Sequence, residues 1–185
     1  MLPTIYTIGH SSHDLSTFFS YLKRYNIDQI IDIRRSPRST NYPHFNIDQL
    51  KEECLLPRSS FKYIFYGDIL GGRRHRRHKS IGNLNNGLLD SDLHGYADHM
   101  QRIEFHQIVN ELVLSSSSSS LVLMCSENNP EQCHRSLLAD YLCLIHHINV
   151  VHILFNGEIC VHHINLLAKV NDDNNSCIYP GISLI

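Results

Sequence analysis

Five short apolar runs, separated by segments with helical periodicity, limit the folds open to this chain. The runs lie at residues 5–8, 29–34, 61–66, 121–125 and 150–155. Apolar stretches of this length are typical of buried strands when turn residues bound them. Strands that alternate with helices form βαβ units, and such strands pair mainly in parallel. We therefore predict an α/β fold, with a single domain over residues 1–170 and a mainly parallel or mixed sheet flanked by helices.

Several segments predict the helices that cover this sheet. In the first, Ser12 is the expected N-cap, and apolar side chains recur at helical spacing on one face: Leu15, Phe18, Phe19 and Leu22. A short helix is expected around residues 47–53. A longer helix is expected over residues 96–113, where one stripe carries Tyr96, Met100, Ile103, Val109 and Leu112.

Two low-complexity segments are not expected to contribute to the core. The run of six serines at residues 115–120 predicts an exposed loop between a helix and a strand. Residues 171–185 form a polar tail that is rich in Asn and Asp before a short apolar end. This tail is expected either to fray or to add an edge strand.

Composition indicates the cellular compartment in which the protein is expected. A chain of 185 residues can bury one good core, and its formal net charge of -2 does not indicate a general polyanion binder. No segment reaches the roughly 18 apolar residues that span a bilayer, and the amino terminus lacks a signal-peptide pattern. The 6 cysteines lack paired spacing, which favours reduced thiols. We therefore expect a cytoplasmic protein with no membrane partner, and leave its oligomeric state open.

The segment at residues 121–142 carries the strongest functional signal. An apolar strand runs into a polar turn and then into a helix, for which Asn129 suits the N-cap and Pro130 the first position. The first turns of this helix carry Cys133, His134 and Arg135. The free N–H groups and the dipole of a helix N-terminus favour a thiolate or a bound phosphate, sulfate or carboxylate.

A polar crevice is expected where the strands end. Loops that leave the carboxyl ends of parallel strands gather along one edge of the sheet, and ligands usually bind there. The candidate anion-binding residues in these loops are Ser11, Asp32, Arg34, Gly71, Gly72, Arg73 and Arg135. The candidate catalytic residues are Cys133, His134, His10 and Glu127.

Each catalytic candidate has an expected role. Cys133 would be a nucleophile or redox thiol, and His134 or His10 its proton-transfer partner. Glu127 would act as a base or orient an arginine. The expected ligand is an anionic small molecule that bears phosphate, such as a nucleotide, or a nucleic-acid backbone or lesion.

Several better-defined motifs are absent. Cys125 follows a strand, as the nucleophile of a phosphatase or rhodanese loop does, but position 131, where such a loop requires arginine, is Glu131. The chain has neither a Walker loop nor a Gly-x-Gly-x-x-Gly fingerprint. It also lacks His-Glu-x-x-His and paired-cysteine spacing, so we assign no metal ligands and identify no cofactor.

Five motifs in order carry a resemblance to a known family. They are T-I-G-H-S, D-I-R-x-S-P, L-G-G-R, Y-A-D-H-M and C-S-E-x-x-P-x-x-C-H-R, between Thr7 and about Gly157. This combination resembles the bacterial and archaeal domain of unknown function family 488. The resemblance implies a compact α/β domain with no settled biochemical role, although members are sometimes labelled as DNA-repair related. The pocket residues that it implies are His10, Ser11, Asp32, Arg34, Gly71, Gly72, Glu127, Cys133, His134 and Arg135.

A rival function uses the basic run at residues 71–79. With four arginines, two histidines and a lysine, this loop has the charge of a phosphate-binding surface. The protein would then be a non-catalytic nucleic-acid-binding module, or a DNA-repair accessory module, that contacts the backbone. A simply solvated loop explains the same charges, and a structural or regulatory adaptor without a ligand is the third alternative.

The candidate residues also have structural interpretations. Cys133 would be a small residue packed against the sheet, as buried cysteines commonly are. Arg135 would pair with Glu131 or Glu127 across one helical turn. Asp32 and Arg34 share a strand face and would form a buried pair, since an unpaired buried charge costs several kcal/mol.

Overall fold

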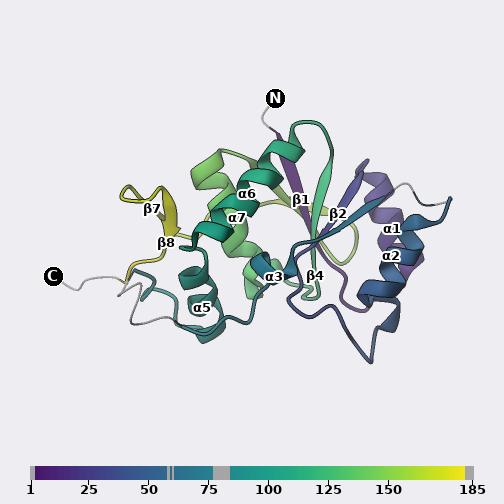
Figure 1. Ribbon diagram of the computed structural model, residues 1–185, viewed down its shortest axis with the longest axis horizontal. Helices are drawn as coiled ribbons and strands as arrows, with labels where there is room; N and C mark the ends of the chain where they lie inside the picture. The colour runs from purple at the N-terminus through teal and green to yellow at the C-terminus, as the bar shows by residue number, and fades with distance from the viewer. Residues whose placement is uncertain (1–2, 58, 60, 77–83, 182–185) are drawn as a thin grey trace.

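A mixed six-stranded sheet forms the centre of the molecule (Figure 1). The computed structural model describes residues 3–57, 59, 61–76 and 84–181. The strands are β1 (Thr4–Gly9), β2 (Gln29–Asp32), β3 (Lys62–Phe65), β4 (Leu121–Cys125), β5 (Asn149–Ile153) and β6 (Ile159–Val161). Their order is β3-β2-β4-β1-β5-β6, with β6 antiparallel to β5 and the others parallel. The predicted single α/β domain with a mixed sheet is confirmed.

Helices cover both faces of the sheet. One layer contains α1 (Leu15–Arg24) and α2 (Ile47–Leu55), and the other contains α5 (Ser91–His99), α6 (Ile103–Ser116) and α7 (His134–His146). Side chains of a strand alternate between the faces, so Leu123 of β4 joins the core beneath α5–α7 while Val122 joins the core beneath α1 and α2. A single turn, α3 (Gly67–Leu70), follows β3.

The central position of β4 fixes where the polar loops meet. All five of its residues are buried, because strands flank it on both sides and helices cover both faces. Its last residue, Cys125, is in register with Gly9, and Met124 is in register with Asp32. The carboxyl ends of β1, β2 and β4 therefore lie side by side.

The prediction of one long helix over residues 96–113 is wrong, because the chain forms two helices there. Between α5 and α6 the backbone leaves the helical conformation at Arg102, whose ψ is 144°. Tyr96 is buried from α5 and Val109 from α6, so the break lets each helix turn its own apolar side to the core. Ile103, expected on the common stripe, is 66% exposed.

Two smaller expectations also change. The N-cap of α1 is Asp14 and not Ser12, since Asp14 Oδ1 accepts the backbone N–H of Thr17 at 2.7 Å. The serine run is not entirely a loop, because α6 continues through Ser116. The remaining serines make the turn into β4.

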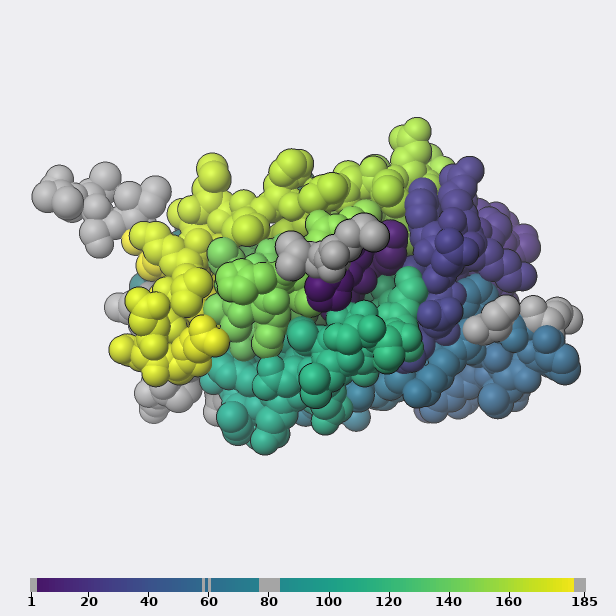
Figure 2. Space-filling model, turned by 90° about the horizontal axis from the view of Figure 1, so that it is seen from above, coloured from purple at the N-terminus to yellow at the C-terminus, as the bar shows by residue number. Residues whose placement is uncertain are grey.

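The tail predicted at residues 171–185 neither frays nor joins the main sheet over its described part. Its residues pair with β7 (Lys169–Asn171) through β8 (Ser176–Ile178), in a separate antiparallel hairpin. Tyr179 is fully buried behind α7. Figure 2 shows this hairpin at the opposite end of the molecule from α1. Residues 182–185 lie outside the described part.

A chain of hydrogen bonds attaches this end of the molecule to the sheet. Asp140 of α7 accepts the Tyr179 hydroxyl at 2.8 Å and His162 Nε2 at 2.9 Å. His162 in turn meets His152 at 3.0 Å, and His152 meets the Thr7 hydroxyl at 2.7 Å. These polar groups satisfy one another, so the cluster links α7, β1, β5 and the hairpin.

None of the described helices is long and apolar enough to cross a membrane.

Candidate active site

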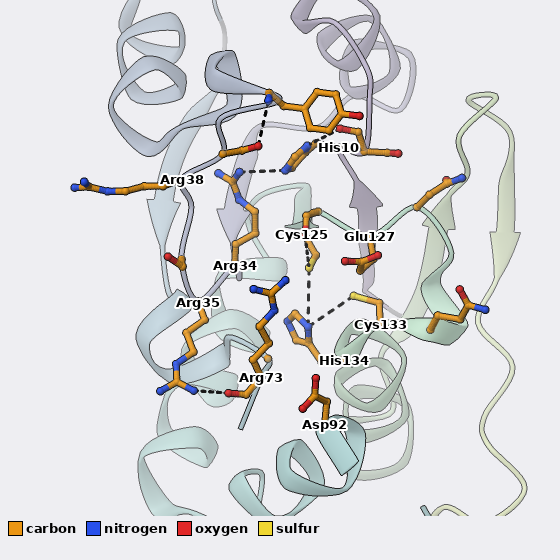
Figure 3. Close-up of a pocket in the computed structure, with 18 of the residues that line it drawn as sticks. His10, Arg34, Arg35, Arg38, Arg73, Asp92, Cys125, Glu127, Cys133 and His134 are labelled. Atoms are coloured by element: carbon orange, nitrogen blue, oxygen red, sulfur yellow. Dashed lines mark hydrogen bonds between the residues drawn. The ribbon is translucent and has the colours of Figure 1, made fainter. Parts of the chain in front are cut away.

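A cavity of about 1130 Å³ opens at the carboxyl ends of β1, β2 and β4 (Figure 3). Of the predicted site residues, those that line it are His10, Ser11, Arg34, Gly72, Arg73, Glu127, Cys133 and His134. Three others lie behind its walls: Asp32, Gly71 and Arg135. The structure therefore brings most of the predicted residues together, but gives some of them supporting positions.

Asp32 holds Arg34 in place. Its carboxylate is fully buried and accepts Arg34 Nε at 2.9 Å and Nη2 at 2.6 Å, the two-pronged geometry of a strong ion pair. It also accepts the backbone N–H of Arg34 and the hydroxyl of Tyr63. With its oxygens occupied in this way, Asp32 compensates the charge of Arg34 and is not placed to contact a ligand.

His10 supports the same guanidinium. Its Nδ1–H donates to the Ser11 carbonyl at 3.0 Å, so its Nε2 accepts from Arg34 Nη1 at 3.1 Å. Burial, and then the charge of Arg34, lower the pKa of His10 to about 4. His10 is therefore neutral near pH 7 with its lone pair engaged, which favours a positioning role over the proton transfer expected from the sequence.

Backbone strain is found at two residues of the cavity wall. Ser11 and Arg73 both have positive φ, at 45° and 55°, a region that residues with side chains seldom adopt. Such strain persists only where the surroundings enforce it, and it gathers at functional sites. Nearby, a Cβ at Gly9 would overlap the Glu127 carbonyl, so glycine allows the loop after β4 to close onto β1.

Three arginines besides Arg34 line the cavity. Arg35 and Arg38 follow β2, Arg73 follows the Gly71–Gly72 turn, and all three side chains are exposed. Arg35 donates to the carbonyl of Arg73. Within the described residues, no carboxylate lies at ion-pair distance from any of the three. We call Arg34, Arg35, Arg38 and Arg73 the arginine wall.

The opposite side of the cavity carries sulfur and imidazole. Figure 3 shows Cys125, Glu127 and Cys133 across from Arg34, Arg35 and Arg38. Cys125 ends β4, Cys133 is the N-cap of α7, and His134 is the first residue of that helix. His134 Nδ1 lies 3.9 Å from the Cys125 sulfur and 3.7 Å from the Cys133 sulfur. We call Cys125, Cys133 and His134 the thiol cluster.

The two thiols are coupled. A hydrogen bond from Cys133 holds the pKa of Cys125 well below its usual range, and His134 and Arg135 add to this effect against the desolvation that burial imposes. The same hydrogen bond, with burial, holds the pKa of Cys133 well above its usual range. The pair therefore favours a single thiolate on Cys125, whereas the sequence pointed to Cys133.

The ring of His134 has little room to turn. Its Nε2 lies 3.2 Å from the carbonyl of Ile33, and the ring of Tyr96 packs against it with centroids 4.9 Å apart. On another side, a Cβ at Gly72 would come within 2.7 Å of Nδ1. These contacts keep Nδ1 turned toward the two sulfurs.

Arg135 is a support and not a wall of the cavity. It is fully buried, and its Nη2 donates to the carbonyls of Glu127 at 2.6 Å and Asn128 at 3.1 Å. Its Nε and Nη1 have no hydrogen-bond partner among the described residues. The guanidinium thus holds the loop between β4 and α7 from behind, in place of the anion clamp expected from the sequence. Neither of the ion pairs expected for it, with the carboxylates of Glu131 or Glu127, is formed among the described residues.

The basic run contributes less to the cavity than its charge suggests. Arg74 donates to the carbonyls of Gly71, Asp68 and Ile69, which terminates α3. Arg76 meets His94 at 3.3 Å. Residues 77–79 of the run lie outside the described part of the chain. Among its described arginines, Arg73 is the one that lines the cavity.

The candidate residues named from the sequence leave out several polar residues that line the cavity, among them Cys125, Arg35, Arg38, Asp90 and Asp92. Cys125 was set aside because the phosphatase spacing fails, yet its place at the end of a central strand was a usable signal. Arg35 and Arg38 follow β2 and carried the same signal. Position relative to a strand end was more informative here than agreement with a known motif.

The fold and this cavity define an α/β domain with a cysteine-, histidine- and arginine-lined site at the carboxyl edge of its sheet. The chain belongs to the family described as domain of unknown function DUF488, which it matches over residues 14–142. The match begins after His10 and Ser11 and ends within α7. No curated protein matches the chain, and no solved structure matches it.

Proposed function

We propose that this DUF488 protein binds an anionic, phosphate-bearing ligand in the cavity. The observation that carries this proposal is the arginine wall, where the exposed guanidiniums of Arg35, Arg38 and Arg73 have no carboxylate partner among the described residues. Arginine presents several donors in a fixed plane, which matches the oxygens of phosphate. Arg34 adds a rigid donor group at the base of the same wall.

The size of the cavity favours a nucleotide-sized ligand over a bare ion. Its volume of about 1130 Å³ slightly exceeds the range of about 300–1,000 Å³ that is usual for small-molecule sites. The arginine wall would hold the phosphate, and the remaining part of the ligand would extend toward Glu127 and the thiol cluster. That part of the ligand would then lie against sulfur and imidazole.

Calorimetric titration at low salt tests this proposal. The probes are inorganic phosphate, a nucleoside monophosphate and a short single-stranded oligonucleotide. We expect Arg35→Gln and Arg38→Gln each to raise the Kd of the monophosphate about 10-fold or more, since a hydrogen bond to a charged group contributes about 1.5–3 kcal/mol. Arg102→Gln is the matched control, because Arg102 is an exposed arginine paired with Glu104 away from the cavity.

The outcomes separate the ligand classes. Tight binding of the monophosphate that weakens in both cavity variants supports the proposal. Binding of the oligonucleotide alone, with loss in Arg76→Gln but not in Arg38→Gln, favours the nucleic-acid-binding alternative through the basic run. If Arg35→Gln and Arg38→Gln bind each probe as the unmodified protein does, the cavity is not an anion site.

A thiol-based reaction is the second candidate function. It is favoured by Cys125 and Cys133, whose sulfurs share one wall of the cavity. Iodoacetamide should then label one of this pair faster than Cys160, which is half-buried elsewhere on the surface. All six cysteines are free thiols, which supports a reducing compartment such as the cytoplasm as the site of action.

A further inference from the structure

We infer that Cys125, Cys133 and His134 bind a thiophilic divalent metal ion, with zinc as the first candidate, and leave one coordination position open to the cavity. The inference goes beyond anion binding and does not depend on it. Each of the three residues offers one ligand atom, and these atoms all lie within 4.8 Å of one another. No spacing motif indicated this, because Cys125 and Cys133 are separated by a loop of seven residues.

The distances suit a tetrahedral ion. Zinc binds cysteine sulfur at about 2.3 Å and histidine nitrogen at about 2.0–2.1 Å, so the two ligand atoms of a tetrahedral site lie about 3.6 Å apart. In this protein Nδ1 of His134 lies 3.7 Å from one sulfur and 3.9 Å from the other. These two distances exceed the tetrahedral value by a few tenths of an ångström at most, and the two sulfurs lie within 4.8 Å of each other.

When the His134 imidazole is neutral, its surroundings favour the tautomer that a metal requires. A backbone carbonyl only accepts hydrogen bonds, so the contact with Ile33 places the hydrogen of His134 on Nε2. In the neutral ring Nδ1 then presents its lone pair to the two sulfurs. Metal-binding histidines commonly donate their other N–H to a carbonyl or carboxylate in this way, which fixes the ring and strengthens the ligand.

The surroundings hold these ligands in place before any ion binds. Cys125 is 4% exposed at the end of the most buried strand, and Cys133 is 2% exposed at the start of α7. Tyr96 and Gly72 confine the His134 ring from two sides. Little conformational entropy remains to be lost on binding, which favours tight coordination.

A buried cation lies behind the thiol cluster. Two thiolates neutralise a divalent ion, and Arg135 supplies a further positive charge from behind the β4–α7 loop. The Nε and Nη1 of this guanidinium lack partners among the described residues, although it is fully buried. A buried unpaired charge is unfavourable, so nearby thiolates stabilise Arg135 as much as it stabilises them.

The fourth position faces the cavity. All three ligands line it, and no fourth cysteine, histidine or carboxylate belongs to the cluster in the described part of the chain. Structural zinc sites are closed by four protein ligands, whereas catalytic sites keep a position for water or substrate. A metal here would face the arginine wall across the cavity and would activate water or polarise a ligand held there.

The metal alone serves as the probe, on the full chain purified under reducing conditions without chelator. We expect about one zinc per chain by elemental analysis. Cobalt substitution should give visible bands of tetrahedral coordination and a near-ultraviolet sulfur-to-cobalt charge-transfer band. Cys125→Ser, Cys133→Ser and His134→Gln should each weaken zinc binding at least about 100-fold, more than loss of a supporting contact does.

Matched controls isolate the site. Cys160→Ser and His163→Gln replace the same residue types outside the cavity and should bind zinc as the unmodified protein does. Gly72→Ala keeps all three ligands but displaces the His134 ring, so it should weaken zinc binding about 10- to 100-fold, as loss of a supporting contact does. Thermal unfolding of each variant identifies any that do not fold.

Three results would overturn the inference. One is folded, reduced protein that binds neither zinc nor cobalt. Another is binding that survives all three ligand substitutions as well as it survives the controls. The last is rapid alkylation of Cys125 or Cys133 at saturating zinc, which would assign the sulfurs to thiol chemistry. These measurements contain no phosphate. Their outcome is therefore independent of whether the proposed anion binding is found.

Discussion

Arg34 and Arg135 are both buried beside the same cavity, but their charged groups have different kinds of partner. Arg34 donates to a buried carboxylate and to a neutral imidazole. Arg135 donates to two backbone carbonyls and leaves Nε and Nη1 without partners among the described residues. The first arginine is a completed ion pair, and the second is a cation with no carboxylate partner among the described residues, whose charge lowers the pKa of Cys125.

This difference separates the two sides of the cavity by chemistry. Next to Arg34, the groups already satisfy one another, so that region forms a rigid wall for a ligand. Next to Arg135, the structure has an excess of positive charge and donors, so that region is suited to hold thiolates or a thiolate-bound metal. Comparing the free energies of unfolding of variants at the two sites therefore measures how much each buried charge depends on its protein partners.

The largest expected effect is the loss of the Arg34 counter-charge. Asp32→Asn should lower the free energy of unfolding by about 3–5 kcal/mol, because it leaves a buried guanidinium without an anion. Urea denaturation measures the change. Glu104→Gln removes the carboxylate of an exposed pair and should lower the free energy of unfolding far less, because solvent screens that pair. Equal losses in the two variants would show that the buried pair contributes no more than a surface pair.

A smaller loss is expected at the second arginine. Arg135→Met removes a buried cation and leaves two carbonyls without a donor, but it strands no carboxylate. We expect the free energy of unfolding of the reduced, metal-free protein to fall by about 1–3 kcal/mol. A loss as large as that of Asp32→Asn would mean that Arg135 has an anionic partner even without metal.

Acid should lower the free energy of unfolding through His10, which accepts a hydrogen bond from Arg34. Its pKa is lowered to about 4 in the folded protein from 6.5, so between these values the unfolded chain binds more protons. Stability is therefore highest above pH 6.5 and falls as the pH drops toward 4. His10→Gln should make this dependence shallower by up to about 1.4 kcal/mol per pH unit, the contribution of one proton.

The pH experiment is a difference measurement, because other histidines act in the same direction. Burial lowers the pKa of His99 to about 4 and that of His152 to about 3. Both titrate in the unmodified protein and in His10→Gln, so subtraction isolates His10. An exposed histidine, His163, gives the control His163→Gln. If the two variants have the same pH dependence of stability, the titration of His10 does not contribute to the acid sensitivity of the protein.

The smallest effect tests a single hydrogen bond to Asp32. Tyr63→Phe removes a hydroxyl that lies 2.6 Å from the carboxylate and should cost about 1 kcal/mol. Burial and the Asp32 charge raise the pKa of Tyr63, so this hydroxyl remains a donor. Tyr66→Phe removes a similar bond to Glu111 at the surface and should change stability by less than about 0.5 kcal/mol. Thermal unfolding at one pH compares the two variants.

Much of the fold was predictable because strands and helices leave local patterns. The apolar runs at residues 29–34 and 121–125 became β2 and β4 to within two residues, since burial on both faces requires near-continuous apolar sequence. The break between α5 and α6 was not predictable in this way. Helical spacing continues through Ile103, and only packing against separate parts of the core shows that the axis changes there.

The site, like the fold, was predictable where local sequence determines it and unpredictable where packing does. Local sequence placed polar residues at the ends of the strands, because the carboxyl ends of parallel strands must share one edge. It also showed that Asp32 and Arg34 share a strand face. It did not show which neighbours on α7 face the cavity, since successive helical residues differ by about 100° in direction. His134 therefore lines the cavity while Arg135 is buried behind it.

From its residues alone, this chain specifies an α/β sheet, a polar carboxyl edge and the residue types available for chemistry there. The partners of those residues depend on the folded chain. Cys125 meets Cys133 and His134 because a loop closes back on the end of β4, and that path depends on Gly9 and on Arg135, which are remote from each other in sequence. Contacts between distant segments carry no periodic signal, so they become visible only once the core has set the distances.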